Sequence, residues 1–177
     1  MVKTDGWGSV SVLEKMEIID QVSKSYYVES MENKSLNAYE GGCLCGAVRY
    51  KVDGEPSVVA HCHCESCQRG SGAGHSTGAV FPAVGVRLTG HVSEYKYTSD
   101  NGNEVTRVFC PECGSPILGH NSSTKGYVSI TLGTIDDSSN LEPKVVVFAR
   151  NRKPWDGLDQ GLPTFEDQPN WKPEVDV

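Results

Sequence analysis

The segment Cys110-Pro111-Glu112-Cys113-Gly114 does most to decide the fold of this 177-residue chain. In a C-P-x-C-G knuckle, two thiolates converge on one ion while backbone N–H groups point at the sulfurs. Glycine after the second cysteine permits the left-handed turn that this knuckle needs. Zinc prefers four ligands in a tetrahedron, so this pair predicts two more ligands elsewhere in the sequence.

A second incomplete pair lies in Gly41-Gly42-Cys43-Leu44-Cys45-Gly46, where glycines let the backbone wrap closely around a metal. Joining it to the knuckle gives a closed four-cysteine site of Cys43, Cys45, Cys110 and Cys113. A closed zinc site of this kind contributes folding free energy. Spacing does not prove the pairing, but it is the simplest arrangement of two half-sites.

A third group, Cys62-His63-Cys64-Glu65-Ser66-Cys67, places three cysteines within six residues. Three thiolates from one short loop can occupy one face of a zinc ion and leave a fourth position open. Three protein ligands plus an exchangeable water or substrate are typical of catalytic zinc. This group therefore predicts an open site that involves Cys62, Cys64 and Cys67.

The alternative is that a histidine closes this site. His61 and His63 both adjoin Cys62, so in extended backbone they would face away from it. His75 follows the glycine-rich segment 70–74, which could bend back toward the cysteines. His75 is therefore the best candidate to complete the tetrahedron or to support it from outside, and we favour the open site.

The seven cysteines also admit readings other than zinc. An odd number would leave one thiol outside a full disulfide framework. No βαβ pattern follows Cys64 or Cys110, which disfavours a thioredoxin-like redox centre. Short knuckles suit a single ion better than an iron–sulfur cluster, although all-thiolate sites also bind iron.

The composition limits the kinds of partner and the cellular compartment that we expect for this protein. The net charge of −7 argues against non-specific nucleic-acid binding, which needs clustered lysine and arginine. No apolar run reaches membrane-spanning length, and the first ten residues lack a signal-peptide core. We expect a cytoplasmic protein without nucleic-acid or membrane partners, and in a reducing compartment paired cysteines are more often metal ligands than disulfides.

Residues 1–38 form a predicted N-terminal extension without cysteine or histidine. Ser11 and Glu14 fit a capping box, in which each side chain satisfies a free backbone N–H. A helix over about residues 12–27 is predicted by apolar residues at helical spacing: Val12, Met16, Ile19, Val22 and Tyr26. A loosely ordered leader is the alternative.

Residues 39–150 show alternation typical of strands and predict a mostly antiparallel β domain. The clearest case is Val48–Val52, where apolar and basic residues alternate. Further strands are expected at Ser57–His61, Gly78–Phe81, Val86–Thr89, Ser93–Thr98, Val105–Phe109, Tyr127–Ile135 and Val145–Arg150. Residues 151–177 hold four prolines and predict an irregular tail that packs on the surface of the domain.

The sequence resembles a known family, the glutathione-dependent formaldehyde-activating enzymes, which also include centromere protein V. The resemblance runs from about Tyr39 to Phe165 and preserves the order of the cysteine groups. It is carried by GGCLCGAVRY (41–50), HCHCESCQRGSGA (61–73), FCPECGSPI (109–117), KPW (153–155), GLP (161–163) and Phe165. It implies a mainly β, Mss4-like (β-tent) fold of antiparallel sheets pinned by zinc.

The resemblance also implies two zinc ions with separate roles. The structural ion would be held by Cys43, Cys45, Cys110 and Cys113, and the catalytic ion by Cys62, Cys64 and Cys67. The implied activity is that of a carbon–sulfur lyase on thiol–carbonyl adducts, with glutathione as a possible co-substrate. In the family reaction, glutathione adds reversibly to formaldehyde and gives S-hydroxymethylglutathione.

Residues near the open site suggest how such chemistry would be assisted. Glu65, His63 and His75 are candidates for proton transfer. A tripeptide thiol with two carboxylates would also need cations, and the candidates are Arg69, Arg150, Arg152 and Lys153. Three thiolates make zinc a weak Lewis acid, which favours ligand exchange and positioning over water activation.

Two other functions stay open. The chain could be a non-catalytic zinc-binding module for protein interaction, or an enzyme of the same fold with a dedicated pathway substrate. The intact cysteine triplet favours an enzyme, because a binding module does not need an open site. His75 stands where the family pattern suggests an apolar or aromatic residue, so the substrate pocket can differ from that of the family.

Overall fold

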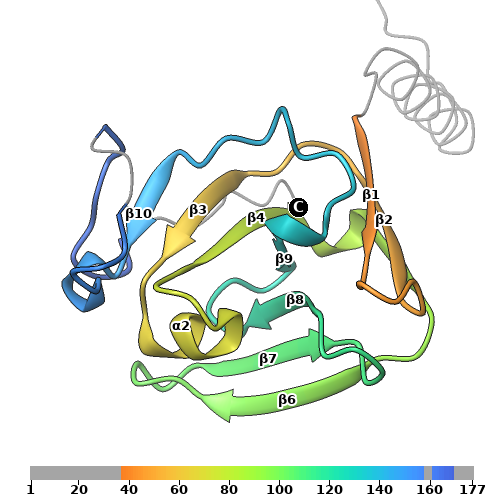
Figure 1. Ribbon diagram of the computed structural model, residues 1–177, viewed down its shortest axis with the longest axis horizontal. Helices are drawn as coiled ribbons and strands as arrows, with labels where there is room; N and C mark the ends of the chain where they lie inside the picture. The colour runs from red at the N-terminus through yellow and green to blue at the C-terminus, as the bar shows by residue number, and fades with distance from the viewer. Residues whose placement is uncertain (1–36, 158–160, 170–177) are drawn as a thin grey trace, which may run out of the picture. The chain divides into compact units, whose positions relative to one another are not determined.

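The computed structural model describes residues 37–157 and 161–169, which contain two β-sheets (Figure 1). The smaller sheet has three strands in the order β1-β2-β5 and the larger has seven in the order β10-β3-β4-β9-β8-β7-β6. The small sheet consists of β1 (Ala38–Gly42), β2 (Arg49–Asp53) and β5 (Val86–Thr89). The large sheet consists of β3 (Val58–Cys62), β4 (Ser76–Pro82), β6 (Ser93–Thr98), β7 (Glu104–Phe109), β8 (Pro116–Asn121), β9 (Tyr127–Thr131) and β10 (Val145–Val147).

All neighbouring strands are antiparallel except β10, which pairs with β3 in parallel. One α-helix, α2 (Glu65–Ser71), lies within the described ranges and connects β3 to β4. Three short 3₁₀ helices accompany it: η1 (Ala83–Gly85), η2 (Leu132–Thr134) and η3 (Ala149–Asn151). The expectation of a mainly β, Mss4-like domain is confirmed.

The alternating pattern of β2 places its side chains as predicted. Tyr50 and Val52 are buried, whereas Arg49 and Lys51 face solvent. The buried positions of both sheets meet in one core, in which the rings of Tyr39 and Phe81 lie 5.6 Å apart. The small sheet is therefore packed against the large one by apolar burial, the main favourable term in folding.

The segment around η2 joins the two sheets by hydrogen bonds. The backbone N–H of Asp136 donates to the carbonyl of Glu40 on β1 at 2.9 Å. The Tyr50 hydroxyl lies 2.9 Å from the Thr134 hydroxyl oxygen, and Arg49 forms an ion pair with Asp136. Both strands of the β1–β2 hairpin are thus linked to the η2 segment.

Two predicted strands were too long, and two strands and the α-helix were not predicted. The strand expected over Tyr127–Ile135 ends at Thr131, directly before η2, and the strand expected over Val145–Arg150 ends at Val147. The strands β1 and β8 and the helix α2 were missed. Strand β8 begins with proline and contains glycine, both poor strand formers, and α2 has only seven residues, too few for a helical period to stand out.

The predicted helix at residues 12–27 lies outside the described residues, and the domain boundaries stay predictions. The described part of the tail runs beside β10: the N–H of Val146 donates to Pro163 O, and the N–H of Phe165 donates to Val146 O, both at 2.9 Å. Within residues 37–157 and 161–169, no helix combines the length and the apolar character needed to cross a bilayer.

Candidate metal centres

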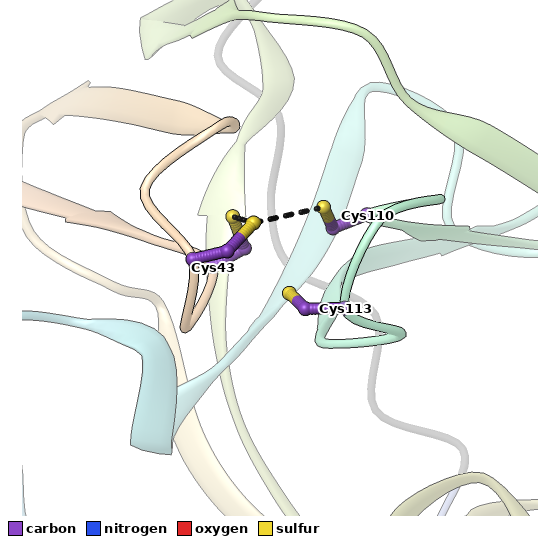
Figure 2. Close-up of side chains that lie close together, drawn as sticks. Cys43, Cys110 and Cys113 are labelled. Carbon is purple, nitrogen blue, oxygen red and sulfur yellow. Dashed lines mark hydrogen bonds between the residues drawn. The ribbon is translucent and has the colours of Figure 1, made fainter.

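The first cysteine cluster joins two hairpin turns that are distant in sequence. Cys43 and Cys45 lie in the turn between β1 and β2, and Cys110 and Cys113 lie in the turn between β7 and β8. Their four sulfur atoms all lie within 4.8 Å of one another. Figure 2 shows Cys43 facing Cys110 and Cys113 across the gap between the turns. The structure thus brings together the residues that the sequence pairs as one site.

Both turns use glycine in the left-handed region. Gly46 has φ +78° and Gly114 has φ +74°, each one residue after the second cysteine of its pair. The turns close through N–H donation from Gly46 to Cys43 O at 3.1 Å and from Gly114 to Cys110 O at 2.9 Å. These bends aim both sulfurs of each pair at one point, as a tetrahedral ion requires.

The crowding of these thiols moves their pKa values in opposite directions. Hydrogen bonds from the side chain and backbone of Ser115 lower the pKa of Cys113 to about 5. The backbone N–H of Ala47 acts to lower the pKa of Cys45, but the neighbouring Cys43 and Cys113 thiols raise it to about 12. Four crowded thiols resist losing all their protons unless a cation compensates, so the donor set fits a bound metal ion.

The second cluster is built at a corner between a strand and a helix. Cys62 ends β3, Cys64 is the N-cap of α2, and Cys67 lies in its first turn. Their three sulfurs lie within 4.8 Å of one another, and the N–H of Cys67 donates to Cys64 Sγ at 3.4 Å. The expectation of a single short loop was wrong: the i, i+3 spacing of Cys64 and Cys67 puts both on one helix face.

Thiol crowding also dominates the electrostatics of this corner. Hydrogen bonds from the Cys62 and Cys67 thiols lower the pKa of Cys64 to about 2, while the contacts with Cys64 and Cys67 raise the pKa of Cys62. Arg107 on β7 adds a cation, with Nη2 3.8 Å from Cys67 Sγ and 2.8 Å from the Ser66 carbonyl. The sequence analysis missed Arg107, because a strand arginine far from the cysteine motifs carries no distinguishing signal.

The histidines form a third group with a residue that sequence reasoning also missed. Asp156 Oδ2 lies 2.9 Å from His75 Nδ1 and 3.3 Å from His63 Nδ1, and these three residues form a group of their own. His75 therefore lies with Asp156 and His63 and not in the group of three cysteine sulfurs. His61 Nδ1 lies 2.8 Å from Thr77 Oγ1. The only hint of Asp156 was its place directly after the family-like KPW segment.

An open pocket of about 290 Å³ lies beside α2 and is lined by Glu65, Gln68, Arg69 and Lys153. Two of the four predicted cations, Arg69 and Lys153, thus stand at one pocket. The other two have partners elsewhere: Arg150 pairs with Asp167 at 2.7 Å and Arg152 donates to the Asp156 carbonyl at 2.9 Å.

The model of the family "glutathione-dependent formaldehyde-activating enzyme" matches residues 38–151, more than half of the chain. The chain belongs to this family. All seven cysteines fall inside the matched region, so the family assignment covers both cysteine clusters. Asp156 lies beyond the matched residues.

The chain is 34% identical over 83 residues to an uncharacterised lyase of Schizosaccharomyces pombe, an alignment that covers 45% of this chain and 55% of the relative. The chain thus spans about half the length of this curated relative. A crystal structure of a Rhodobacter sphaeroides protein has a TM-score of 0.47 and 17% identity, and the match covers 71% of this chain and 98% of that one.

Proposed function

We propose that the protein is a zinc-dependent carbon–sulfur lyase that acts on thiol–carbonyl adducts, such as the adduct of glutathione and formaldehyde. The observation that carries the proposal is the corner of Cys62, Cys64 and Cys67, a group of three thiols that no fourth ligand residue joins within residues 37–157 and 161–169. Membership of the formaldehyde-activating family and the lyase name of the yeast relative support the same reaction class.

In this proposal the two cysteine clusters have different tasks. The closed cluster of four holds a structural ion and ties the two hairpin turns together, which stabilises the fold. The cluster of three holds a second ion whose free position would accept a substrate sulfur or oxygen. An ion that lacks one protein ligand is typical of catalytic zinc.

Arg107 would control the charge of the three-cysteine corner. Three thiolates and one divalent ion carry a net charge near −1, and the guanidinium 3.8 Å from Cys67 Sγ offsets it. The same guanidinium donates to the carbonyl of Ser66 and so fixes the first turn of α2. Arg107 thereby orients two of the three sulfurs, since Cys64 and Cys67 both belong to that turn.

The neighbouring pocket offers the groups that a small peptide thiol needs. Arg69 and Lys153 are cations that can pair with its carboxylates, and Gln68 is held by donating to the carbonyls of His63 and Asn151 at 2.6 and 3.0 Å. Glu65 on the same wall can accept the thiol proton. Specificity for an anionic thiol would therefore reside in α2 and the segment after η3.

The test is exchange NMR on the full chain with formaldehyde and glutathione, which reports interconversion of free thiol and adduct. The zinc-loaded protein is expected to accelerate exchange, and Cys67→Ser is expected to abolish the acceleration. Arg69→Ala and Lys153→Ala should raise KM more than they lower kcat, whereas Arg150→Ala, whose partner is Asp167, serves as the matched control.

Exchange no faster than the uncatalysed reaction would contradict the lyase proposal with this substrate pair. Acceleration with other thiols or aldehydes, but not with glutathione and formaldehyde, would assign the same chemistry to a dedicated substrate. Absence of exchange with every thiol tried, in a fully metal-loaded protein, would favour the non-catalytic zinc-binding module.

A further inference from the structure

We propose that His63, His75 and Asp156 form a third metal site, which binds a divalent transition ion through nitrogen and oxygen and is separate from both cysteine clusters. The site would take an ion suited to imidazole and carboxylate, such as Zn²⁺, Fe²⁺ or Co²⁺. The proposal does not depend on the lyase activity, because it follows from three residues outside both cysteine clusters.

The distances between the three side chains suit ligation of one ion. The carboxylate oxygen Oδ2 of Asp156 lies 2.9 Å from His75 Nδ1 and 3.3 Å from His63 Nδ1. One ligand atom from each residue lies within 4.8 Å of the others. Ligands around an ion with bonds of roughly 2.0–2.2 Å are separated by about 3 Å, so little movement would be needed to bind it.

His63 supplies an independent reason to expect a ligand. Its side chain is 0% exposed, and neither ring nitrogen makes a hydrogen bond of acceptable geometry. Its Nδ1 is close to the Asp156 carboxylate but is not directed at it as a donor. A buried polar group without a partner costs free energy, and a metal ion facing the lone pair would remove that cost.

Asp156 is held in place by close packing on Gly74 and by hydrogen bonds of its backbone. A Cβ built on the buried Gly74 would lie 2.3 Å from Asp156 Cγ, so the carboxylate packs directly on glycine backbone. The Asp156 backbone is fixed at both ends, since its N–H donates to Lys153 O at 3.0 Å and its carbonyl accepts from Arg152 Nε at 2.9 Å. The carboxylate is therefore aimed at the histidines by the fold.

The donor set distinguishes this site from the cysteine clusters. Two imidazoles and one carboxylate form the ligand set that holds Fe²⁺ and Zn²⁺ with open positions for other ligands. The carboxylate supplies the single negative charge and each imidazole binds as a neutral ligand. The side chain of His75 is 22% exposed, so an ion can reach the site from solvent past this residue.

The test counts cobalt in two ways on the full chain, after removal of bound metals under reducing conditions. Total cobalt is measured by elemental analysis, and thiolate-bound cobalt by its sulfur-to-metal charge-transfer absorption. The proposal predicts one ion more by elemental analysis than charge transfer reports. Asp156→Asn and His75→Gln should each weaken that extra ion by about tenfold or more, and leave the thiolate-bound ions unchanged.

Matched controls separate ligation from damage to the fold. His120→Gln changes an exposed histidine on β8 and should retain the extra ion. Gly74→Ala should displace Asp156 and abolish binding of the extra ion. Gly157→Ala, where a Cβ would meet nothing within 4 Å, should still bind the extra ion. Equal counts by the two methods in the wild type, or an extra ion that survives both Asp156→Asn and His75→Gln, would overturn the proposal. Neither result would bear on the lyase activity.

Discussion

The net charge of a metal centre depends on single residues beside it, and Arg107 is the clearest case. It is the guanidinium in contact with a sulfur of the three-cysteine corner, through Nη2 and Cys67 Sγ. Neutral Arg107→Met should lower the metal affinity of this corner by roughly 10–100-fold, as loss of supporting contacts does at metal sites. Competition with a chromophoric chelator measures the affinity.

Two further variants give the Arg107 experiment its controls. Arg107→Lys keeps the charge and should recover part of the affinity. Arg87→Met removes an exposed arginine of β5 that pairs with Asp53, and it should have no effect on metal binding. Unchanged affinity in Arg107→Met would show that the guanidinium does not support the centre.

Tyr50 makes stability depend on alkaline pH. Burial raises its pKa from 10.0 to about 12, so the folded state holds the phenolic proton more tightly than the unfolded state. The resulting stabilisation is complete below pH 10 and is lost as the pH rises toward 12; it amounts to at most about 2–3 kcal/mol. Tyr50→Phe should flatten the fall in unfolding free energy over this range.

Urea unfolding at neutral pH and at two alkaline pH values checks the Tyr50 prediction. The variant should also lose about 1 kcal/mol at neutral pH, because the hydrogen bond to Thr134 disappears. Tyr95→Phe, at an exposed phenol, controls for removal of a hydroxyl. An equal alkaline loss in Tyr50→Phe and wild type would exclude this residue as the cause.

Some residues of the candidate metal centres could be predicted from the sequence, and others could not. The cysteines were identifiable because C-P-x-C-G and C-x-C pairs have a spacing that metal geometry demands. Asp156 and Arg107 were not, since each reaches its centre only through tertiary contacts: Asp156 through the segment that follows η3, Arg107 through the position of β7 beside α2. A lone aspartate or arginine has no local pattern that reports such a contact.

At the scale of elements, the contact between β1 and η2 depends on a glycine. A Cβ at Gly41 would lie 2.3 Å from Thr134 O and from the Tyr50 hydroxyl. Gly41→Ala should therefore destabilise the protein by about 1–3 kcal/mol, because a backbone group must move. Gly133→Ala, where a Cβ would meet nothing within 4 Å, should stay within about 0.5 kcal/mol of wild type.

Chemical denaturation of the two alanine variants checks this contact. An equal effect of both substitutions would mean that the small sheet can shift without cost.

The alternation of apolar and polar residues predicted most strands well, β2 best of all, because one face of the strand is buried and the other is solvated. It failed at α2, whose ends are set by the Cys64 cap and the left-handed Gly72 and not by any periodic pattern.

At the scale of the whole described domain, the two sheets share one core, and turns from both sheets meet at the four-cysteine cluster. Figure 1 shows the β1–β2 hairpin beside the larger sheet, with β7 and β8 reaching toward its turn. The core depends on apolar contacts between the sheets, such as Tyr39 with Phe81. We expect the cluster of four to stabilise this arrangement and the cluster of three to be dispensable for it.

We expect the seven cysteines to divide into a structural four and a functional three. This division is tested most directly by counting thiolate-bound metal per chain while recording folded structure by circular dichroism, in wild type, Cys67→Ser and Cys110→Ser. Two thiolate-bound ions are expected in wild type, one ion in a folded Cys67→Ser, and loss of structure in Cys110→Ser. A single thiolate-bound ion in wild type, or unfolding of Cys67→Ser, would contradict the claim.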